Sequence, residues 1–597
     1  MRIAVLVKQI PKFEEMELGP DGRLRRDGIE LEMNPYCRRA VSKGVELAAE
    51  RAGSRVTVFT LGPPPAEDTL REAIAWGLER DVDIDAVHVT DVAFAGSDTL
   101  ATAKALAVAL TREGPFDLVL SGRNSVDADT GQVGPELAEL LDLPFLTGVR
   151  ELAIDGALVD ARCEHDDGWM QAQVELPAVL SCAERLCEPA KVDPDGRAAV
   201  PAGRIRRLRA ADLGPGPWGA DGSPTWVGPV KVMAVSRARI THADAPLVDQ
   251  VRNAVHILHE RGAIRETTTD APVGVVHPWT PPAAKPAVVV VAEPDRAHAT
   301  RELLGVAARL AAEIDSPVAV ITVEDPDVEL LGAWGADHVV QLVGPNVEED
   351  VARGVAEWAG AEPDPPWAIV TGSTAWGREV AARVAARLEA GLTGDAVDLE
   401  VGDRRLVAWK PAFGGQLVAA IGATSAIQMA TVRAGMITAP APRTADFEPG
   451  FRRVAMAARG RVRVLARTRD DDLDALAEAA TVIGLGRGVP PDEYSAIEPL
   501  RVLLDAELGA TRKVTDEGWL PRARQIGLTG RSIAPRLFVS IGASGKFNHT
   551  IGLRAARTVL AINNNPGAPI FDAADAGIVG DWHEVLPLLV AELEQGR

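Results

Sequence analysis

QIGLTGRSIAPRLFVSIGASGKFNHT, residues 525–550, decides the fold of the C-terminal part of this chain. The stretch places two glycine-bounded polar turns, GLTG and GASG, beside short apolar runs and the lone His549. Glycine has no Cβ, so such turns let the backbone approach a bound ring or phosphate closely. The runs 536–541 and 558–562 are typical of buried parallel strands that lead into such turns. The pattern predicts a cofactor site rather than simple core packing.

Apolar runs that alternate with helical stretches fill the rest of the chain, and they form two series. The first series comprises residues 3–7, 56–61, 86–89 and 118–121, and the second comprises residues 287–292, 318–323, 339–342 and 368–371. Ala/Leu/Glu/Arg-rich helical stretches separate the runs, which is the signature of parallel α/β layers. Because the two series line up, the sequence predicts an internal duplication.

The two copies differ in one loop. FDLVLSG ends at Gly122 and PWAIVTG ends at Gly372, and each is followed by a helix and a Leu-Thr-Gly element. From that Gly to the Thr the first copy spans 25 positions, 122 to 147, and the second spans 21, 372 to 393. The four extra residues lie in the acidic loop RNSVDADTGQVGP. Polar loops at strand C-termini hold nucleotides, so we predict one nucleotide site in the first copy and a vestigial twin in the second.

Length and composition exclude several classes of protein. At roughly 150 residues per domain, 597 residues predict three to four domains. The net charge of −22 argues against a nucleic-acid surface. No apolar run reaches the roughly 18 residues of a membrane span, so we expect a cytoplasmic protein that is not integral to the membrane. Four cysteines are too few for a disulfide framework, and we expect free thiols.

Ordered motifs carry a resemblance over most of the chain. The C-terminal motifs are Gly-Arg-Gly at 486–488, Thr-Arg at 511–512, Asp-x-Gly-Trp at 516–519, Gln-x-Gly-x-Thr-Gly at 525–530, Ser-Gly-x-x-x-His at 544–549, Ala-Ile-Asn at 561–563 and Ala-Pro-Ile-Phe at 568–571. In this order they resemble the FAD domain of the electron transfer flavoprotein alpha subunit. KPAFGGQLVA at 410–419 and QMATVRAG at 428–435 resemble the first domain of that subunit.

The first copy resembles the beta subunit of the same family. The motifs are VLVKQIP at 5–11, NPYC at 34–37, LGPP at 61–64, GSDTLATAKAL at 96–106 and the acidic loop. The resemblance implies beta and alpha subunits fused in one α/β chain, with two repeated parallel-sheet nucleotide-binding-like domains and a C-terminal α/β FAD-binding domain. The implied division is 1–190 beta-like, 191–284 Pro/Gly-rich arm and linker, 285–467 alpha-like domain I, and 468–597 FAD-binding. Pro and Gly disfavour helix in the arm, except at 245–261, where the spacing predicts a docking helix.

The family's FAD site maps onto the C-terminal motifs residue by residue. By this resemblance Thr529 approaches flavin N5, His549 the O2 side of the ring, and Arg512 stabilises the anionic flavin. Taken alone, His549 would be a core histidine and Thr529 a turn residue, and the ordered set favours FAD. Leu528 replaces the common Gln and keeps only its backbone N–H as a donor, which we expect to shift the potential. The full set is Arg487, Thr511, Arg512, Gln525, Ile526, Gly527, Leu528, Thr529, Ser544, Gly545, Asn548, His549, Asn563, Asp581 and Trp582.

The acidic loop is predicted to hold a second nucleotide, AMP or a second FAD. Its backbone N–H groups, Thr130 and Gln132 would wrap a phosphate near the helix that opens after Gly134. Asp127 and Asp129 are more typical of loop capping than of a metal site, and no metal is predicted. The GxGxG string at 484–488 lacks the acidic residue of an NAD site. The predicted set is Leu6, Asn34, Cys37, Gly122, Asp127, Asp129, Thr130, Gln132 and Val133, with Asn34 and Cys37 on the adenine side.

The resemblance implies an electron carrier. Its FAD would accept electrons from flavin-dependent dehydrogenases and pass them to a quinone oxidoreductase or another acceptor, with no catalytic side chain. An NADH-oxidising, electron-bifurcating flavoprotein with two FAD is the alternative, and the loop form D-x-D-T-x-Q-V-G-P with GSPT at 222–225 is similar to that branch. A third hypothesis is a non-redox nucleotide-sensing scaffold without flavin. A yellow colour of the purified protein would exclude it. The chain after LPAV lacks the family's Leu-Pro recognition arm, so the sequence leaves the partners open.

Overall fold

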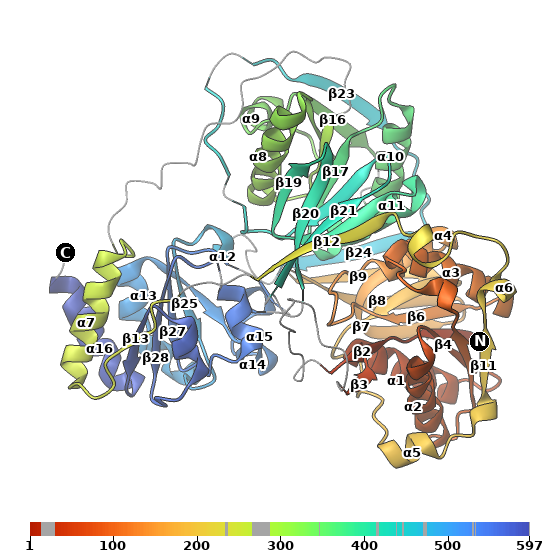
Figure 1. The fold of residues 1–597 in the computed structure, drawn as a ribbon, viewed down its shortest axis with the longest axis horizontal. Coiled ribbons are helices and arrows are strands. Elements are labelled where there is room, and N and C mark those ends of the chain that lie inside the picture. Colours follow the sequence, from red (N-terminus) through yellow and green to blue (C-terminus); the bar gives the residue numbers. More distant parts are fainter. Residues whose placement is uncertain are drawn as a thin grey trace.

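The computed structural model of this chain describes residues 1–12, 30–166, 168–232, 237–264, 287–344, 347–412, 417–437, 439–444, 447–469, 475–527, 530–531, 533–553 and 555–595. The described residues form three α/β bodies (Figure 1): the red-to-orange first half, the green-to-cyan second half and the blue C-terminal body. These names denote the bodies built on the sheets of β1 (Arg2–Leu6), β14 (Val288–Val291) and β25 (Thr481–Leu485). None of the described helices is long and apolar enough to cross a membrane. All four cysteines are free thiols, as predicted.

The first half is built on a sheet that contains ten of the described strands, in the order β11-β5-β4-β1-β6-β10-β7-β8-β9-β24. The strands are β4 Arg55–Leu61, β5 Ile84–Val89, β6 Leu118–Gly122, β7 Phe145–Asp155, β8 Leu158–His165, β9 Gly168–Glu175, β10 Ala178–Cys182, β11 Ile205–Leu208 and β24 Val462–Arg469. Strands β11 to β7 pair in parallel, and β8, β9 and β24 extend the sheet antiparallel. The principal helices are α1 Pro35–Glu50, α2 Glu67–Leu78, α3 Thr99–Glu113 and α4 Val133–Leu140. Apolar cores lie on both faces, which is why the central strands are apolar at nearly every position.

The second half has a parallel sheet in the order β18-β22-β17-β14-β15-β16-β23 and a smaller antiparallel sheet in the order β12-β21-β20-β19. The parallel strands are β15 Val318–Thr322, β16 His338–Val343, β17 Ala368–Gly372, β18 Gly391–Ala396, β22 Gln428–Val432 and β23 Gly450–Ala455. The antiparallel strands are β12 Thr225–Val232, β19 Asp398–Gly402, β20 Arg405–Ala412 and β21 Leu417–Ala423. The helices are α8 Ala297–Ile314, α9 Val328–Ala333, α10 Glu348–Ala361 and α11 Ala375–Leu388. All eight strands of the two predicted series are therefore present.

The strand order confirms the internal duplication. The run β11-β5-β4-β1-β6-β10-β7 in the first half corresponds position by position to β23-β16-β15-β14-β17-β22-β18 in the second. In each sheet the earliest strand, β1 or β14, is central. The next parallel strands are added on one side of it, and β6 or β17 is then added on the other side. The strand order reverses there, and ligands of open α/β sheets bind at such a point.

The two halves exchange strands. β12 follows the first half in the chain but pairs with β21 of the second half, and β24 follows the second half but pairs with β9 of the first. Each half thus completes an antiparallel meander of the other. The exchange fixes the two halves against each other through backbone hydrogen bonds.

The C-terminal body is a parallel sheet in the order β13-β29-β28-β27-β25-β26. Its other strands are β13 Ile240–Thr241, β26 Ala506–Ala510, β27 Leu537–Ile541, β28 Thr558–Asn563 and β29 Ala576–Val579. Its helices are α7 Leu247–Glu260, α12 Ala475–Glu478, α13 Glu498–Leu504, α14 Arg512–Asp516, α15 Phe547–Thr550 and α16 Trp582–Gln595. The earliest strand of the sheet proper, β25, lies between β26 and β27, so the order reverses there too.

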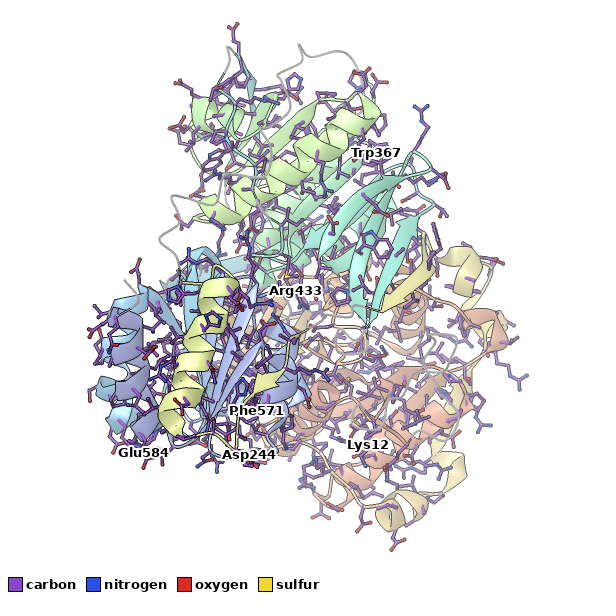
Figure 2. The ribbon with its side chains drawn as sticks, turned by 60° about the vertical axis from the view of Figure 1, so that its left-hand side comes forward. Lys12, Asp244, Trp367, Arg433, Phe571 and Glu584 are labelled. Atoms are coloured by element: carbon purple, nitrogen blue, oxygen red, sulfur yellow. The ribbon has the colours of Figure 1, made fainter. Side chains whose placement is uncertain are left out.

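The arm between the halves carries more structure than its Pro and Gly content predicts. Its described part forms α5 (Pro194–Ala198), β11, α6 (Ala210–Leu213), β12, β13 and α7. Proline is tolerated in the first turn of a helix and on edge strands, which are the positions this arm uses. The helix predicted at 245–261 is present as α7, and its apolar face joins the core of β29 and α16. Figure 2 shows α7 laid across the C-terminal body.

Candidate nucleotide sites

The first candidate site lies at the reversal point of the C-terminal body, where the loops after β25 and β27 meet. The Gly486 amide donates to Ile541 O at 2.8 Å and the Gly488 amide to Gly542 O at 3.2 Å. A Cβ at Gly486 would collide with Gly542 O and the Ala543 backbone, so only glycine permits this approach. Two glycine loops are therefore packed backbone to backbone at the C-terminal ends of the strands.

The turn that begins at Gln525 is anchored beside this crevice. The Ile526 amide donates to Ala510 O at 2.8 Å, and Gly527, at φ 135°, donates to Arg531 O at 2.9 Å. The Gln525 side chain is buried and accepts a hydrogen bond from Thr515 Oγ1 at 2.8 Å, so it anchors the start of the turn in the protein interior. Leu528 and Thr529 lie outside the described residues.

His549 on α15 closes the same region. Its Nδ1 lies 3.0 Å from Ile526 O, which can only accept, so Nδ1 carries the hydrogen. Burial lowers the pKa of His549, which favours the neutral ring. Its buried Nε2 has no hydrogen-bond partner among the described residues. An orphaned acceptor of this kind fits a ligand group at this position.

The remaining predicted FAD residues frame the crevice or flank it. Ser544 and Gly545 follow β27, Asn548 lies on α15, and Asn563 ends β28 and donates from Nδ2 to Ala543 O at 2.9 Å. Gly545 has φ 74°, and a Cβ there would collide with the Ile570 backbone. Trp582 donates to Gly488 O at 3.1 Å. Arg487, Thr511 and Asp581 lie at strand ends nearby, with Arg487 60% exposed and 3.7 Å from Glu517.

Arg512 joins the C-terminal body to the first half. It forms ion pairs with Glu184 of the first half and with Asp516 at 3.3 Å, and Arg185 pairs with the same Asp516. Burial would lower the pKa of Arg512, but Glu184 and Asp516 raise it above its usual value. Glu184 and Arg185 were not predicted from the sequence, since isolated charges carry no motif.

The second candidate site is the acidic loop after β6, at the reversal point of the first half. Asn34 holds the loop from both sides: its Nδ2 donates to Asn124 O at 2.9 Å, and its Oδ1 accepts from the Val126 amide at 3.2 Å. Its Nδ2 also lies 3.3 Å from Cys37 Sγ. A Cβ at Gly122 would lie 2.8 Å from Tyr36 Cβ, so the loop begins hard against α1. Leu6 ends β1 and Val133 begins α4, which brings every predicted residue of this set to one edge of the sheet.

Both aspartates of the loop are engaged within the protein. Lys8 Nζ lies 2.8 Å from both Asp127 oxygens, and Asn124 donates to Asp129. Burial would raise the pKa of Asp127, but Lys8 holds it below its usual value. The carboxylates are thus oriented and compensated, as capping groups are. Lys8 was missed in the sequence because a single lysine after a strand carries no distinctive signal.

Gln132 lies at the base of the loop. Its side chain is 1% exposed, and its Oε1 accepts from Thr99 Oγ1 at 2.8 Å. Its Nε2 is buried with no hydrogen-bond partner among the described residues. An unsatisfied buried amide is costly, so this donor fits a bound acceptor such as a phosphate.

The equivalent place in the second half is filled by protein carboxylates. Glu293 accepts from Thr374 Oγ1 at 2.6 Å, and Asp166, from the end of the β8 hairpin, accepts from the Ala375 amide at 2.5 Å. Burial would raise the pKa of Asp166, but Arg123 and the Ala375 amide lower it to about 2. The Asp166 carboxylate stands at the N-terminus of α11, where a phosphate would bind in a working site. This arrangement fits the predicted vestigial twin.

Comparison with known proteins identifies the family. Residues 21–204 and 288–465 match the electron transfer flavoprotein domain, and residues 475–554 match the electron transfer flavoprotein FAD-binding domain. The chain is 34% identical over 310 residues to the electron transfer flavoprotein subunit alpha of Thermoanaerobacterium thermosaccharolyticum, covering 49% of this chain and 92% of that protein. It is 36% identical over 265 residues to subunit beta of the same organism, covering 44% of this chain and 97% of that protein.

A further relative is the caffeyl-CoA reductase-Etf complex subunit CarD of Acetobacterium woodii. It is 34% identical over 230 residues, covering 38% of this chain and 86% of CarD. Together these matches and the three-body α/β fold define an FAD-binding redox protein. The chain belongs to the electron transfer flavoprotein family, with beta-like and alpha-like parts in one polypeptide.

Proposed function

We propose that this chain is a single-polypeptide electron carrier that holds FAD at the β25/β27 crevice, accepts electrons from flavin-dependent dehydrogenases and delivers them to a quinone oxidoreductase or another acceptor. The observation that supports it most is the pair of glycine loops beside the orphaned Nε2 of His549. FAD, when bound, supplies one- and two-electron transfer. The predicted domain division at 190, 284 and 467 and the predicted FAD residues belong to this proposal.

The chain's own residues would bind and tune the cofactor. The Gly486–Gly488 and Gly542–Gly545 loops present backbone N–H groups at strand ends, which suits a pyrophosphate. His549, held in one tautomer by Ile526 O, offers Nε2 to the ring as an acceptor or, once protonated, as a donor. Arg512 provides a fixed cation whose charge is partly offset by Glu184 and Asp516.

A glycine exchange tests the FAD site. Gly486→Ala puts a Cβ into Gly542 O and should yield protein with little FAD. Gly567→Ala is the matched control, because a Cβ there meets only Asn565 Oδ1, at 3.5 Å. FAD released from the pure proteins is counted per chain by absorbance. Stoichiometric FAD in folded Gly486→Ala protein would place the cofactor elsewhere.

We further propose that the acidic loop holds the second nucleotide, AMP or FAD. The orphaned amide of Gln132 supports this. Shortening the loop by Asp127 to Thr130, to the length of its twin, should abolish retention of the second nucleotide and spare the C-terminal FAD. Nucleotide extraction that gives wild-type ratios from this deletion would reduce the loop to a surface connection.

The second candidate function is NADH-oxidising electron bifurcation with two FAD. The D-x-D-T-x-Q-V-G-P form of the loop favours it, and a relative belongs by name to a caffeyl-CoA reductase-Etf complex. Two FAD per chain together with anaerobic bleaching of the flavin by NADH would establish this reading. One FAD, one AMP and no response to NADH would establish the simple carrier.

A further inference from the structure

We propose that the second half contributes two cations, Lys410 and Arg378, to the nucleotide site of the first half, and that Lys410 contacts a phosphate of the bound nucleotide. This inference rests on the proposed second nucleotide and assigns it residues from the other half. The nucleotide would then bridge the two halves.

Gly394 on β18 brings the second half against the acidic loop. A Cβ at Gly394 would lie 2.9 Å from Gln132 Nε2 and 3.5 Å from Thr130 Cα. Lys410 on β20 donates from Nζ to Gly394 O at 2.9 Å. Gly394 therefore lies between the Lys410 ammonium group and the unsatisfied amide of Gln132.

Arg378 approaches the same loop from the first turn of α11. A Cβ at Gly131 would lie 3.7 Å from Arg378 Cδ and 4.0 Å from its Nη1. The guanidinium is held by Ser373 Oγ at 3.1 Å and by Asp395 at 3.5 Å. It is thus a positioned cation beside the glycine of the loop.

Among the described residues, the first half offers no unpaired cation beside the loop for a phosphate. The loop carries Asp127 and Asp129, and the two described cations of the first half beside it are already paired. Lys8 lies 2.8 Å from Asp127, and Arg123 lies 4.0 Å from Glu164 and 3.9 Å from Asp166. Buried or partly buried anions need charge-assisted partners. Burial lowers the pKa of Lys410 to about 8, while Asp395 and Asp129 oppose that shift. A phosphate between Lys410 and Gln132 would satisfy both groups.

The internal duplication supports the assignment independently. β8 corresponds to β20, and each strand belongs to a meander that lies at the boundary between the halves. From the first half, the end of the β8 hairpin places the Asp166 carboxylate at the twin site. From the second half, the corresponding strand places a lysine at the working site. The meander of the first half therefore places a carboxylate in the twin site, and the meander of the second half places an ammonium group that would bind a phosphate in the working site.

The test measures nucleotide retention by the full-length protein. Lys410→Met, Lys410→Arg and Arg378→Gln are compared with Lys104→Met, which removes a lysine charge at the boundary of the halves away from the acidic loop, where Lys104 pairs with Glu389 at 3.1 Å. Released FAD and AMP are counted per chain, and loss of the second nucleotide is followed during gel filtration. The C-terminal FAD serves as the internal reference for folding.

We expect Lys410→Met to lose the second nucleotide at least about tenfold faster than wild type, as befits one partly screened charge contact. Lys410→Arg should retain it better, Arg378→Gln should weaken it, and Lys104→Met should match wild type. Wild-type retention in Lys410→Met, or equal loss in Lys104→Met, overturns this inference and leaves the proposed second site standing. If wild-type protein releases one FAD and no second nucleotide, the proposed second site itself is wrong.

Discussion

Arg383 lies on α11 between the two halves with a fully buried side chain. Its Nη1 lies 2.9 Å from Glu139 of the first half, its Nε lies 3.2 Å from Glu379, and its Nη2 lies 3.8 Å from Glu349. Arg383→Met keeps the volume but removes the cation that the three carboxyl groups share. Glu139 then keeps Arg387 at 2.6 Å and Glu349 keeps Arg461 at 3.0 Å. Removing one partner of a buried ion pair costs about 3–5 kcal/mol.

The assay is thermal unfolding of the FAD-loaded protein, followed by circular dichroism. For a cooperative unit of about 150–250 residues, a loss of about 1 kcal/mol shifts the melting midpoint by roughly 2–4 °C. Arg383→Met should therefore lower the midpoint by about 10 °C. Arg309→Met is the control, because its ion pair with Asp398 is half exposed and worth about 0–1 kcal/mol. Adding Glu379→Gln to Arg383→Met should recover part of the loss, since it replaces a buried carboxyl that must otherwise stay protonated once Arg383 is gone. Equal midpoints for Arg383→Met and Arg309→Met would refute the reasoning.

Three further outcomes are expected. Burial raises the pKa of Glu379 to about 8, above the usual 4.5. The stability that the protonated carboxyl contributes is therefore full below pH 4.5 and is lost as the pH rises through about 8. Glu379→Gln should flatten the fall of the melting midpoint between these pH values. Arg512→Ala should lower the potential for one-electron reduction of the flavin. The loss of driving force is about 1 kcal/mol, since Arg512 is 43% exposed and its charge is screened by solvent. An unchanged redox titration would remove Arg512 from the flavin site. Asp166→Asn should destabilise the boundary of the halves by about 1 kcal/mol, discounted because its side chain is 35% exposed, and an unaltered urea midpoint at pH 7 contradicts its role as cap of α11.

The sequence by itself determined the elements and their repetition. Apolar runs of parallel strands and the helical spacing at 245–261 are local properties. The runs appear in the structure as β1, β4 to β6 and β14 to β17, and the helical spacing appears as α7. The ordered C-terminal motifs also identified the family that the comparisons show. The roles of the predicted site residues stay predictions, with Leu528 and Thr529 outside the described residues.

Only the tertiary structure decided which distant segments meet. The strand exchange of β12 and β24 could not be predicted, because an edge strand's alternating pattern fits many partners equally well. Lys8, Asp166 and Glu184 are single charges whose partners lie 119, 209 and 328 positions away in the chain. Their importance follows from how the three bodies are placed, since a charge gains or loses free energy only through the groups that surround it after folding.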